Sequence, residues 1–352
     1  MMMFTKPHPA QTIRSSDAVF EVKDLGVAYG RDAASVQVVN DVSLSVGRGE
    51  ALGVVGESGC GKSQTMLAAL GLLPRGGRIT SGQVLLEGRN LVDLSPREMR
   101  AVRGSGIALI SQDALTSLNP AMTIGTQMAE PMIHYGGMSR SAARTRCIEL
   151  LDLVGIPGAA TRLASYPHEL SGGMRQRALI AMAISANPKV LIADEPTTAL
   201  DVTTQSQILR LIDSLRKELG MALILITHDL GVVAGVADRV AVLYAGRVVE
   251  TAETETLFAS PRHPYTKALL DTISQLEDEV SERLNPIPGL PPDPRNPVQG
   301  CPFNPRCDYV RDVCRAELPA LADSVEGGRH PVRCHVDPFV GLSLTMASGG
   351  AR

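Results

Sequence analysis

A short glycine-rich segment between two apolar stretches carries the clearest chemistry in this sequence. Residues 56–63 read G-x-x-x-x-G-K-S, the spacing of a loop that binds nucleotide phosphates. Glycines let the backbone turn its N–H groups inward, and the start of a following helix adds a positive dipole, so the loop forms a cradle for anions. We expect the ammonium group of Lys62 to reach the β- and γ-phosphates and the hydroxyl of Ser63 to ligate Mg²⁺.

The flanking residues predict the elements that such a loop needs. Residues 51–55 form a short apolar run that predicts a buried strand, and residues 64–70 predict a helix that begins at the loop. The alternative is a glycine turn with an incidental lysine, which this strand–loop–helix context disfavours.

Two acidic residues end a second apolar run. Residues 189–195 predict a buried strand that ends in Asp194 and Glu195. A carboxylate at this place can hold Mg²⁺ beside Ser63, and its neighbour can orient or deprotonate a water, a contribution of about 10²–10⁴-fold in rate. An acidic pair alone is typical of a solvated cap, but the phosphate loop favours the catalytic interpretation.

A second candidate anion site lies in residues 170–177, which read LSGGMRQR. Ser171, Gly172 and Gly173 at the start of a predicted helix offer a hydroxyl, free N–H groups and a helix dipole. An ordinary helix N-cap is the alternative. Since one nucleotide does not need two separate phosphate cradles in one chain, we infer that the second cradle serves the nucleotide of another subunit.

The rest of the chain predicts an α/β domain interrupted by helices. Strands that alternate with helices after residue 186 predict a parallel sheet, whereas the early strands are expected to be antiparallel. The predicted strands are residues 19–25, two runs in 36–46, two pieces in 79–88, 106–111, 222–227 and a hairpin over 240–250, and the predicted helices are 122–134, 141–154, 172–185 and 205–219.

Composition limits the possible functions. The 352 residues allow one large domain and a smaller appendage, and the 3% aromatic content predicts an aliphatic core. The net charge of −3 argues against non-specific nucleic-acid binding. No run of about 18 apolar residues predicts a membrane span, and residues 1–17 lack a signal core, so we expect a cytoplasmic protein.

Taken in order, these segments resemble the motifs of ATP-binding cassette (ABC) ATPases. The matching segments are the phosphate loop, Gln112, residues 170–176, residues 191–195, residues 198–201 and His228. The resemblance covers about residues 19–258 and implies a RecA-like α/β core, an antiparallel β subdomain and a helical subdomain inserted at about 113–186. It also implies that two such domains close head-to-tail, with ATP between the phosphate loop of one and the LSGG signature of the other.

The resemblance assigns roles by position. Glu195 is implied to be the general base, Gln112 to contact Mg²⁺ and the attacking water, and His228 to contact the γ-phosphate and that water. Ser63, Gln112 and Asp194 are implied to hold Mg²⁺. Tyr29 is implied to stack on adenine, although its position alone favours an ordinary half-buried tyrosine. The residues implied to bind nucleotide are Tyr29, Gly56, Glu57, Ser58, Gly59, Cys60, Gly61, Lys62, Ser63, Gln64, Ser171, Gly172, Gly173 and Asp201.

Four further segments resemble the ATPase subunits of bacterial oligopeptide and dipeptide importers: residues 111–120, 166–170, 263–267 and 287–307. The implied organisation is a leader (1–18), an ABC ATPase domain (19–258), a C-terminal region (259–342) and a tail (343–352). The implied partners are a second, related ATPase subunit, two integral membrane permease subunits and an extracytoplasmic solute-binding protein, with no nucleic acid. The implied location is the cytoplasmic face of the cell membrane.

The C-terminal region contains four cysteines with the spacing C-x5-C-x6-C-x19-C: Cys301, Cys307, Cys314 and Cys334. Four thiolates can hold zinc or a [4Fe–4S] cluster. The tight C-x2-C pairs of common zinc ribbons are missing, and some members of the importer group carry a cluster at matching cysteines. We therefore expect a structural [4Fe–4S] cluster, with zinc or unmetallated thiols as alternatives.

Other functions of this ATPase head are disfavoured to different degrees. DNA-repair and chromosome ATPases have long heptad segments or large insertions between the two motifs, where this chain has only residues 64–170. A GTPase would carry an Asn-Lys-x-Asp motif, which does not occur here. Importers of nickel or other solutes, and exporters, stay open as alternatives to peptide import because solute selectivity resides in other subunits.

Overall fold

The computed structural model describes residues 18–31, 35–112, 117–198, 200–277, 287–323 and 329–339. The predicted leader before residue 18 and the predicted tail of residues 343–352 lie outside these described residues. So do residues 113–116 of the importer-like segment, and Ala199.

Two β-sheets occupy the middle of the molecule. One is antiparallel, with the order β2-β1-β4-β5, and the other has the order β10-β9-β3-β8-β7-β6 and is parallel except for the β10–β9 pair. The predicted antiparallel early strands and the predicted parallel sheet are therefore confirmed. The first sheet contains β1 (Ala18–Tyr29), β2 (Val36–Gly47), β4 (Gly77–Leu86) and β5 (Arg89–Asn90). The second contains β3 (Ala51–Val55), β6 (Ile107–Ile110), β7 (Val190–Asp194), β8 (Ala222–Thr227), β9 (Arg239–Tyr244) and β10 (Arg247–Glu253).

Helices of the described part match the five predicted helices to within about three residues at each end. Before the signature the helices are α1 (Lys62–Ala69), α2 (Pro96–Val102), α4 (Ile124–His134), α5 (Arg140–Leu153), α6 (Ala159–Arg162) and the 3-10 turn η3 (Pro167–Glu169). From the signature onward they are α7 (Gly172–Ile184), α8 (Val202–Leu219), α9 (Leu230–Val236), α10 (Thr254–Ala259), α11 (Pro264–Glu277), the 3-10 turn η4 (Asn304–Arg306) and α12 (Asp312–Ala316). The matching helices are α1, α4, α5, α7 and α8, whereas α2, α6, α9, α10, α11 and α12 were not predicted.

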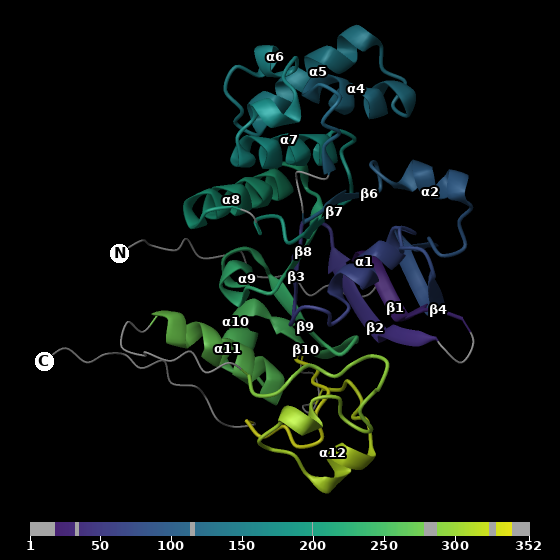
Figure 1. Ribbon diagram of the computed structural model, residues 1–352, viewed down its shortest axis with the longest axis vertical. Coiled ribbons are helices and arrows are strands. Elements are labelled where there is room, and N and C mark those ends of the chain that lie inside the picture. Colours follow the sequence, from purple (N-terminus) through teal and green to yellow (C-terminus); the bar gives the residue numbers. More distant parts are fainter. Residues whose placement is uncertain are drawn as a thin grey trace, which may run out of the picture.

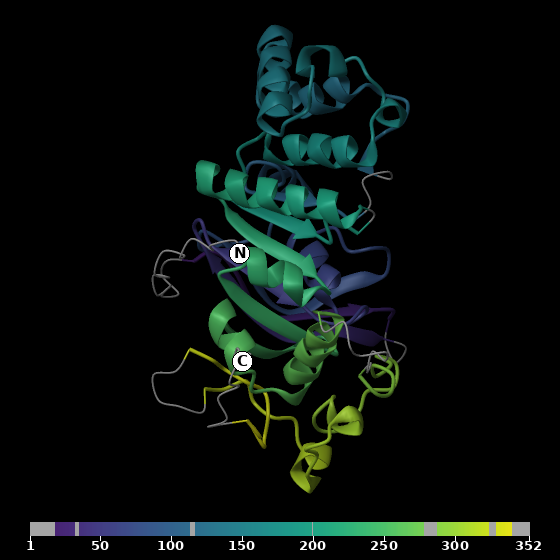
Figure 2. The same ribbon diagram turned by 90° about the vertical axis from the view of Figure 1, so that its left-hand side faces the viewer.

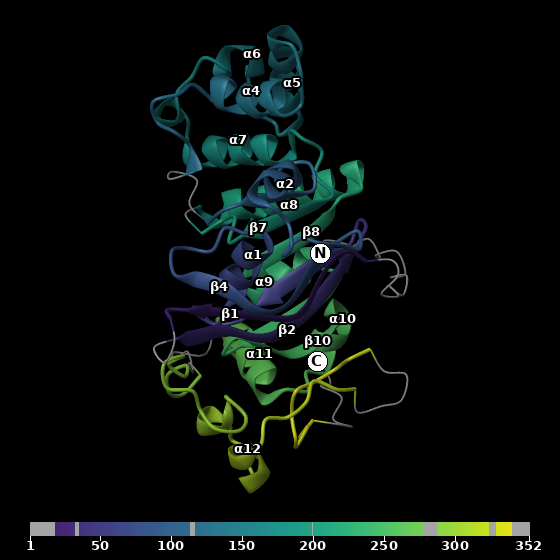
Figure 3. The same ribbon diagram turned by 90° about the vertical axis from the view of Figure 1, so that its right-hand side faces the viewer.

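Three parts follow one another along the long axis of the molecule. Helices α4, α5, α6 and α7 gather at one end, the two sheets lie in the middle, and the C-terminal region with α12 lies at the opposite end (Figures 1 and 3). Figure 2 shows the same order from another side. Within the described residues, no helix combines the length and the apolar character that crossing a bilayer requires.

Two strands of the antiparallel sheet are continuous where the sequence predicted separate pieces. The two strand pieces expected within residues 79–88 are one strand, β4, in which Gly82 has a φ of +86° beside a register shift in β1. The two runs expected in residues 36–46 are likewise one strand, β2, with Asp41 at a φ of +54°. Polar residues and glycine therefore mark irregularities inside these strands rather than turns between strands.

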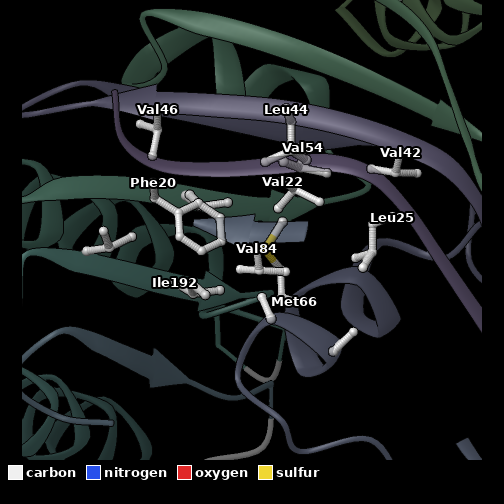
Figure 4. Close-up of a cluster of buried hydrophobic side chains, with 14 of the residues drawn as sticks. Phe20, Val22, Leu25, Val42, Leu44, Val46, Val54, Met66, Val84 and Ile192 are labelled. Atoms are coloured by element: carbon white, nitrogen blue, oxygen red, sulfur yellow. The ribbon is translucent and has the colours of Figure 1, made fainter. Parts of the chain in front are cut away.

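The core between the two sheets fixes both elements that flank the phosphate loop. Phe20 and Val22 of β1, Met66 of α1 and Val54 of β3 belong to one buried cluster, and Figure 4 shows their side chains together with Ile192 of β7. Apart from Phe20, the buried members of this cluster are aliphatic residues, Met66, Met99 and Cys60, as the composition predicts. Each large apolar side chain fully buried in this way contributes about 1.5–3 kcal/mol.

A second buried cluster packs α7 against α4 and α5 at the helical end of the molecule. Met128 of α4, Leu150 of α5 and Ile180 of α7 pack in it, together with Ile208 of α8 and Leu191 of β7. This packing orients α7 so that its first turn, which carries the signature residues, lies at the surface beside α8.

Candidate nucleotide-binding site

The phosphate loop joins β3, which is buried at every residue, to α1. Gly56 and Gly61 have φ angles of +152° and +99°, a region that favours glycine. A Cβ atom on Gly56 would lie 2.2 Å from the carbonyl oxygen of Leu243 in β9, so the loop is also packed tightly against the next strand of the sheet. The backbone geometry of an anion cradle is therefore in place in this chain alone.

Lys62 folds back over the loop. Its Nζ donates hydrogen bonds to the carbonyl oxygens of Gly56 at 2.6 Å and Glu57 at 2.9 Å, and the residue is 6% exposed. The thiol of Cys60 lies 3.7 Å from the same Nζ, and burial raises the pKa of that thiol, so it stays neutral near neutral pH. The ammonium charge is thus held inside the loop, where phosphate oxygens would meet it.

Ser63 and Asp194 supply an oxygen pair beside the loop. The hydroxyl of Ser63 donates to Oδ1 of Asp194 at 3.0 Å, across 131 residues of sequence. Burial raises the pKa of the Asp194 carboxyl, and the hydrogen bond from Ser63 opposes that rise. A hydroxyl and a carboxylate are the ligand types that Mg²⁺ takes in proteins, so these two residues fit the predicted magnesium site.

The carboxylate of Glu195 is the point where the predicted hydrolytic residues meet. Oε2 accepts from the Gln112 side-chain amide at 2.9 Å and from the Thr198 hydroxyl at 3.0 Å, and Oε1 lies 2.9 Å from Nδ1 of His228. Burial alone would raise the pKa of Glu195, but hydrogen bonds from His228 and Thr198 outweigh it and lower that pKa. The carboxylate is therefore ionised and oriented.

Two contacts of this acidic cluster were not predicted. Gln112 donates to Glu195, and its contact with Mg²⁺ stays a prediction. Thr198 was matched only as part of a motif, and its hydroxyl contact with Glu195 was not predicted. Glu195 also has a φ of +45°, an unusual backbone conformation for a residue other than glycine.

Tyr29 lies at the end of β1, next to the first turn of α1. Its hydroxyl donates to Oε1 of Gln64 at 2.5 Å, and its ring packs against Gly77, where a Cβ would lie 2.9 Å from the ring carbons. The tyrosine is thus half-buried and joined to the residue after Ser63, which places it near the phosphate loop. Its stacking on adenine stays a prediction.

The signature residues form a separate site. The hydroxyl of Ser171 accepts a hydrogen bond from the N–H of Met174 at 3.3 Å, and thereby caps α7. Asp201 caps α8 in the same way, since its Oδ1 accepts from the N–H of Thr204 at 2.9 Å. Ser171 and Asp201 line an open hollow. The other residues that line it are Gly172, Gly173, Met174, Arg177, Leu200, Thr204 and Gln207. No residue of the phosphate loop lines this hollow.

The structure therefore divides the predicted site into two groups. In the first group, Ser63 of the phosphate loop is hydrogen-bonded to Asp194, and the next residue, Glu195, is hydrogen-bonded to Gln112 and His228. These residues lie at the carboxyl ends of β3, β6, β7 and β8. The signature and Asp201 face solvent between the starts of α7 and α8.

The four C-terminal cysteines line one narrow cavity, which His263 and His335 also line. Burial, together with the neighbouring thiols, raises the pKa of Cys301 to about 11. Among the described residues, no set of three or more Cys, His, Asp or Glu side chains is gathered closely enough for a single metal ion.

The sequence analysis also missed a contact between the C-terminal region and the phosphate loop. Both side-chain oxygens of Glu57 accept hydrogen bonds from Arg306, and the backbone N–H of Glu57 donates to the hydroxyl of Tyr265 at 2.8 Å. Tyr265 and Arg306 belong to the importer-like segments of residues 263–267 and 287–307, but neither segment indicated a contact with the phosphate loop.

Fold and site together define a nucleoside triphosphatase with a phosphate loop. The profile of the ABC transporter family matches residues 39–198, and that of the oligopeptide/dipeptide transporter C-terminal region matches residues 249–314. The chain belongs to the ABC transporter family, as an ATP-binding subunit that hydrolyses ATP to drive transport. The predicted ABC-type fold is confirmed.

Relatives and solved structures agree with this placement. The chain is 50% identical to the oligopeptide transport ATP-binding protein of Bacillus subtilis over 86% of this chain and 85% of the relative. It is 47% identical to the dipeptide transport ATP-binding protein of Escherichia coli over 90% of this chain and 96% of the relative. Among solved structures it is similar to the dimeric ATP-binding cassette MJ0796 bound to ADP and Pi, with a TM-score of 0.60 and 28% sequence identity. The match covers 67% of this chain and 98% of the solved one.

Proposed function

We propose that this chain is one of two ATPase subunits that close head-to-tail and drive a membrane importer of di- or oligopeptides. The observation that carries the proposal is the split of the site into two groups. The loop and its acidic cluster can grip and hydrolyse ATP, whereas the signature hollow contains no loop residue and is open to solvent. Closure against a second subunit brings a hollow of this kind onto the γ-phosphate, and the solved relative MJ0796 is a dimer with ADP and Pi.

The residues of this chain have distinct tasks in the proposed reaction. Backbone N–H groups of the loop and the ammonium of Lys62 hold the β- and γ-phosphates, and Ser63 with Asp194 would hold Mg²⁺, which neutralises phosphate charge. Glu195 accepts a proton from the attacking water as the water oxygen bonds to the γ-phosphorus and the bond to ADP breaks. Gln112 and His228 keep the carboxylate of Glu195 in place through their hydrogen bonds.

The names of the relatives support a proposal about the partner subunits. Both of the curated relatives described above are named as peptide-transport ATP-binding proteins. We therefore place this chain on the cytoplasmic face of a cell membrane, bound to two permease subunits. A second, related ATPase completes the pair, and an extracytoplasmic protein delivers the solute. Import of nickel or another solute is the alternative.

A reconstituted complex tests this function. The full chain is co-purified with its permease, its partner ATPase and its solute-binding protein, inserted into vesicles and supplied with ATP inside. We expect ATP-dependent uptake of labelled di- or oligopeptides and no uptake of Ni²⁺. Uptake of Ni²⁺ alone would contradict the peptide assignment but not the ATPase, and a complex without ATP-dependent uptake would contradict the importer function.

The four cysteines support a cofactor proposal for the same protein. They line one cavity but are not gathered around a single ion, and a [4Fe–4S] cluster accepts cysteines that lie further apart than the ligands of one zinc ion. We propose that Cys301, Cys307, Cys314 and Cys334 hold such a cluster, which would serve as a cross-link for the C-terminal region.

Anaerobic purification tests the cluster. We expect bound iron and sulfide and a broad absorbance near ~400 nm, both lost in a variant with Cys307→Ser and Cys334→Ser. A variant with Cys147→Ser is the matched control, because Cys147 lies in α5 and is buried in the second cluster, among the helices of the helical end. Protein with one zinc and no iron would contradict the cluster.

A further inference from the structure

A buried arginine outside the ATPase core contacts the phosphate loop. Nη1 of Arg306 donates to Oε2 of Glu57 at 2.7 Å, and Nη2 donates to Oε1 at 2.9 Å, so the pair is bidentate. The Arg306 side chain is 4% exposed and that of Glu57 is 24% exposed. The two residues lie 249 positions apart in the sequence. Bidentate pairs of this kind fix orientation as well as charge.

Arg306 is itself held rigidly by the C-terminal region. It ends the 3-10 turn η4, immediately before Cys307, and its Nε donates to the carbonyl oxygen of Pro288 at 2.8 Å. Its guanidinium lies 5.9 Å from the ring centre of Tyr244 and 5.8 Å from that of Phe303. These contacts place the guanidinium independently of Glu57, so the arginine can position the glutamate rather than follow it.

Glu57 is a position where an unpaired charge would harm ATP binding. It is the second residue of the phosphate loop, and its own carbonyl oxygen accepts a hydrogen bond from Lys62. A free carboxylate in this loop would repel the triphosphate and attract the ammonium of Lys62, because charges separated by less than the Debye length are only partly screened. Pairing with Arg306 cancels this charge and fixes the loop backbone at the same time.

Tyr265 completes the contact from α11. It is fully buried, and its hydroxyl accepts the backbone N–H of Glu57, so that this N–H points toward the C-terminal region. The side chain and the backbone of Glu57 are therefore both fixed by residues outside the core fold.

We propose that Arg306 is a positioning residue for ATP binding, acting through Glu57. The proposal rests on the proposed function in that the loop must receive ATP. It adds that the C-terminal region sets the affinity of the loop for ATP by neutralising Glu57. The positioning acts on binding more than on the chemical step, because Glu195 and its partners do not contact Arg306.

The test uses the full chain and the variants Arg306→Ala, Arg306→Lys and the double variant Glu57→Gln with Arg306→Ala. For Arg306→Ala we expect the KM for ATP and the Kd for a fluorescent ATP analogue to rise about tenfold, with kcat within about twofold of the wild type. Lysine neutralises the charge of Glu57 without the bidentate geometry, so the KM and Kd of Arg306→Lys should lie between those of the wild type and of Arg306→Ala. The double variant should regain at least half of the lost affinity on a logarithmic scale, because no unpaired carboxylate is left.

A matched control separates this effect from general damage to the C-terminal region. Arg295 forms an ion pair with Asp293 in the same region, but the two side chains are 78% and 46% exposed. Arg295→Ala should leave both KM and kcat unchanged. In about 1 M salt, where the Debye length is ~3 Å, the Arg306→Ala defect should shrink.

Two results would overturn the proposal. One is wild-type affinity for ATP in Arg306→Ala, and the other is a double variant as weak as Arg306→Ala itself, which would mean that the charge of Glu57 plays no part. If the wild-type chain does not bind ATP at all, the proposed function fails instead, so the two failures are distinguishable. Arg306→Lys keeps the test available if Arg306→Ala does not fold.

Discussion

The two anion-binding regions of this chain are built in opposite ways. The phosphate loop is enclosed: Lys62 is 6% exposed, Gly56 packs against β9, and Glu57 is held by Tyr265 and Arg306. The signature is open: Ser171 and Gly172 are exposed at the start of α7, and the hydroxyl of Ser171 makes a single long hydrogen bond within its own turn.

The difference indicates which half of the site works alone. Preorganised groups cost little to reorganise when a ligand arrives, so an enclosed loop can bind ATP in an isolated subunit. An open helix start offers a dipole and N–H groups to an anion from one side only. It therefore binds the anion strongly only when another protein surface covers the opposite side. The chain therefore carries a complete binding half and an incomplete closing half.

The largest expected effect comes from the enclosed half. Glu195→Gln removes the proposed proton acceptor but keeps the side-chain volume, so phosphate release should slow by about 10²–10⁴-fold while ATP binding persists. Steady-state phosphate release and equilibrium ATP binding on the full complex measure the two quantities.

A surface glutamate provides the control for this change. Glu218 is exposed near the end of α8, and Glu218→Gln should match the wild type in both measurements. Normal turnover in Glu195→Gln would remove the general base from the mechanism, and the enclosed half would then only bind.

A smaller effect is expected at the open half. Ser171→Arg places a bulky side chain at the mouth of the hollow, so hydrolysis by the assembled pair should fall by about tenfold or more, since closure is needed to complete the site. ATP binding by the isolated subunit should change by less than about twofold, because the loop does not contact this hollow.

The control adds the same side chain elsewhere. Ser141 is exposed in the first turn of α5, in the same helical end of the molecule, and Ser141→Arg should leave hydrolysis unchanged. If Ser171→Arg weakens ATP binding by the isolated subunit as much as it slows hydrolysis, the signature belongs to the same site as the loop and the comparison fails.

Local sequence predicted most of this arrangement. The buried run of β3, the glycines and the helix start are adjacent in the chain, so the loop could be read from its spacing. Asp194 and Glu195 follow a buried parallel strand, whose carboxyl end must lie near that of β3.

Contacts between distant segments could not be predicted in this way. The Arg306–Glu57 pair joins residues 249 positions apart, and nothing in the proline-rich stretch before Arg306 fixes where it folds. The irregularities in β2 and β4 were taken as breaks between separate strands for a related reason. A positive φ at Asp41 or Gly82 is compatible with a break or with a continuous strand, and only the pairing with β1 shows that each strand is continuous.

The smallest predicted effect separates the two roles that Ser171 can have. As the N-cap of α7 it accepts the N–H of Met174 at 3.3 Å, a long bond, so Ser171→Ala should lower the free energy of unfolding by only about 0.5–1 kcal/mol in urea titrations. Ser139 caps α5 with equal chemistry, accepting the N–H of Ala142 at 3.2 Å, and Ser139→Ala should cost about as much. Only Ser171→Ala should also slow hydrolysis, by the roughly two- to tenfold that one net hydrogen bond represents. Equal hydrolysis in the two alanine variants would reduce Ser171 to a helix cap, and the open half would then owe its function to the backbone of Gly172 and Gly173.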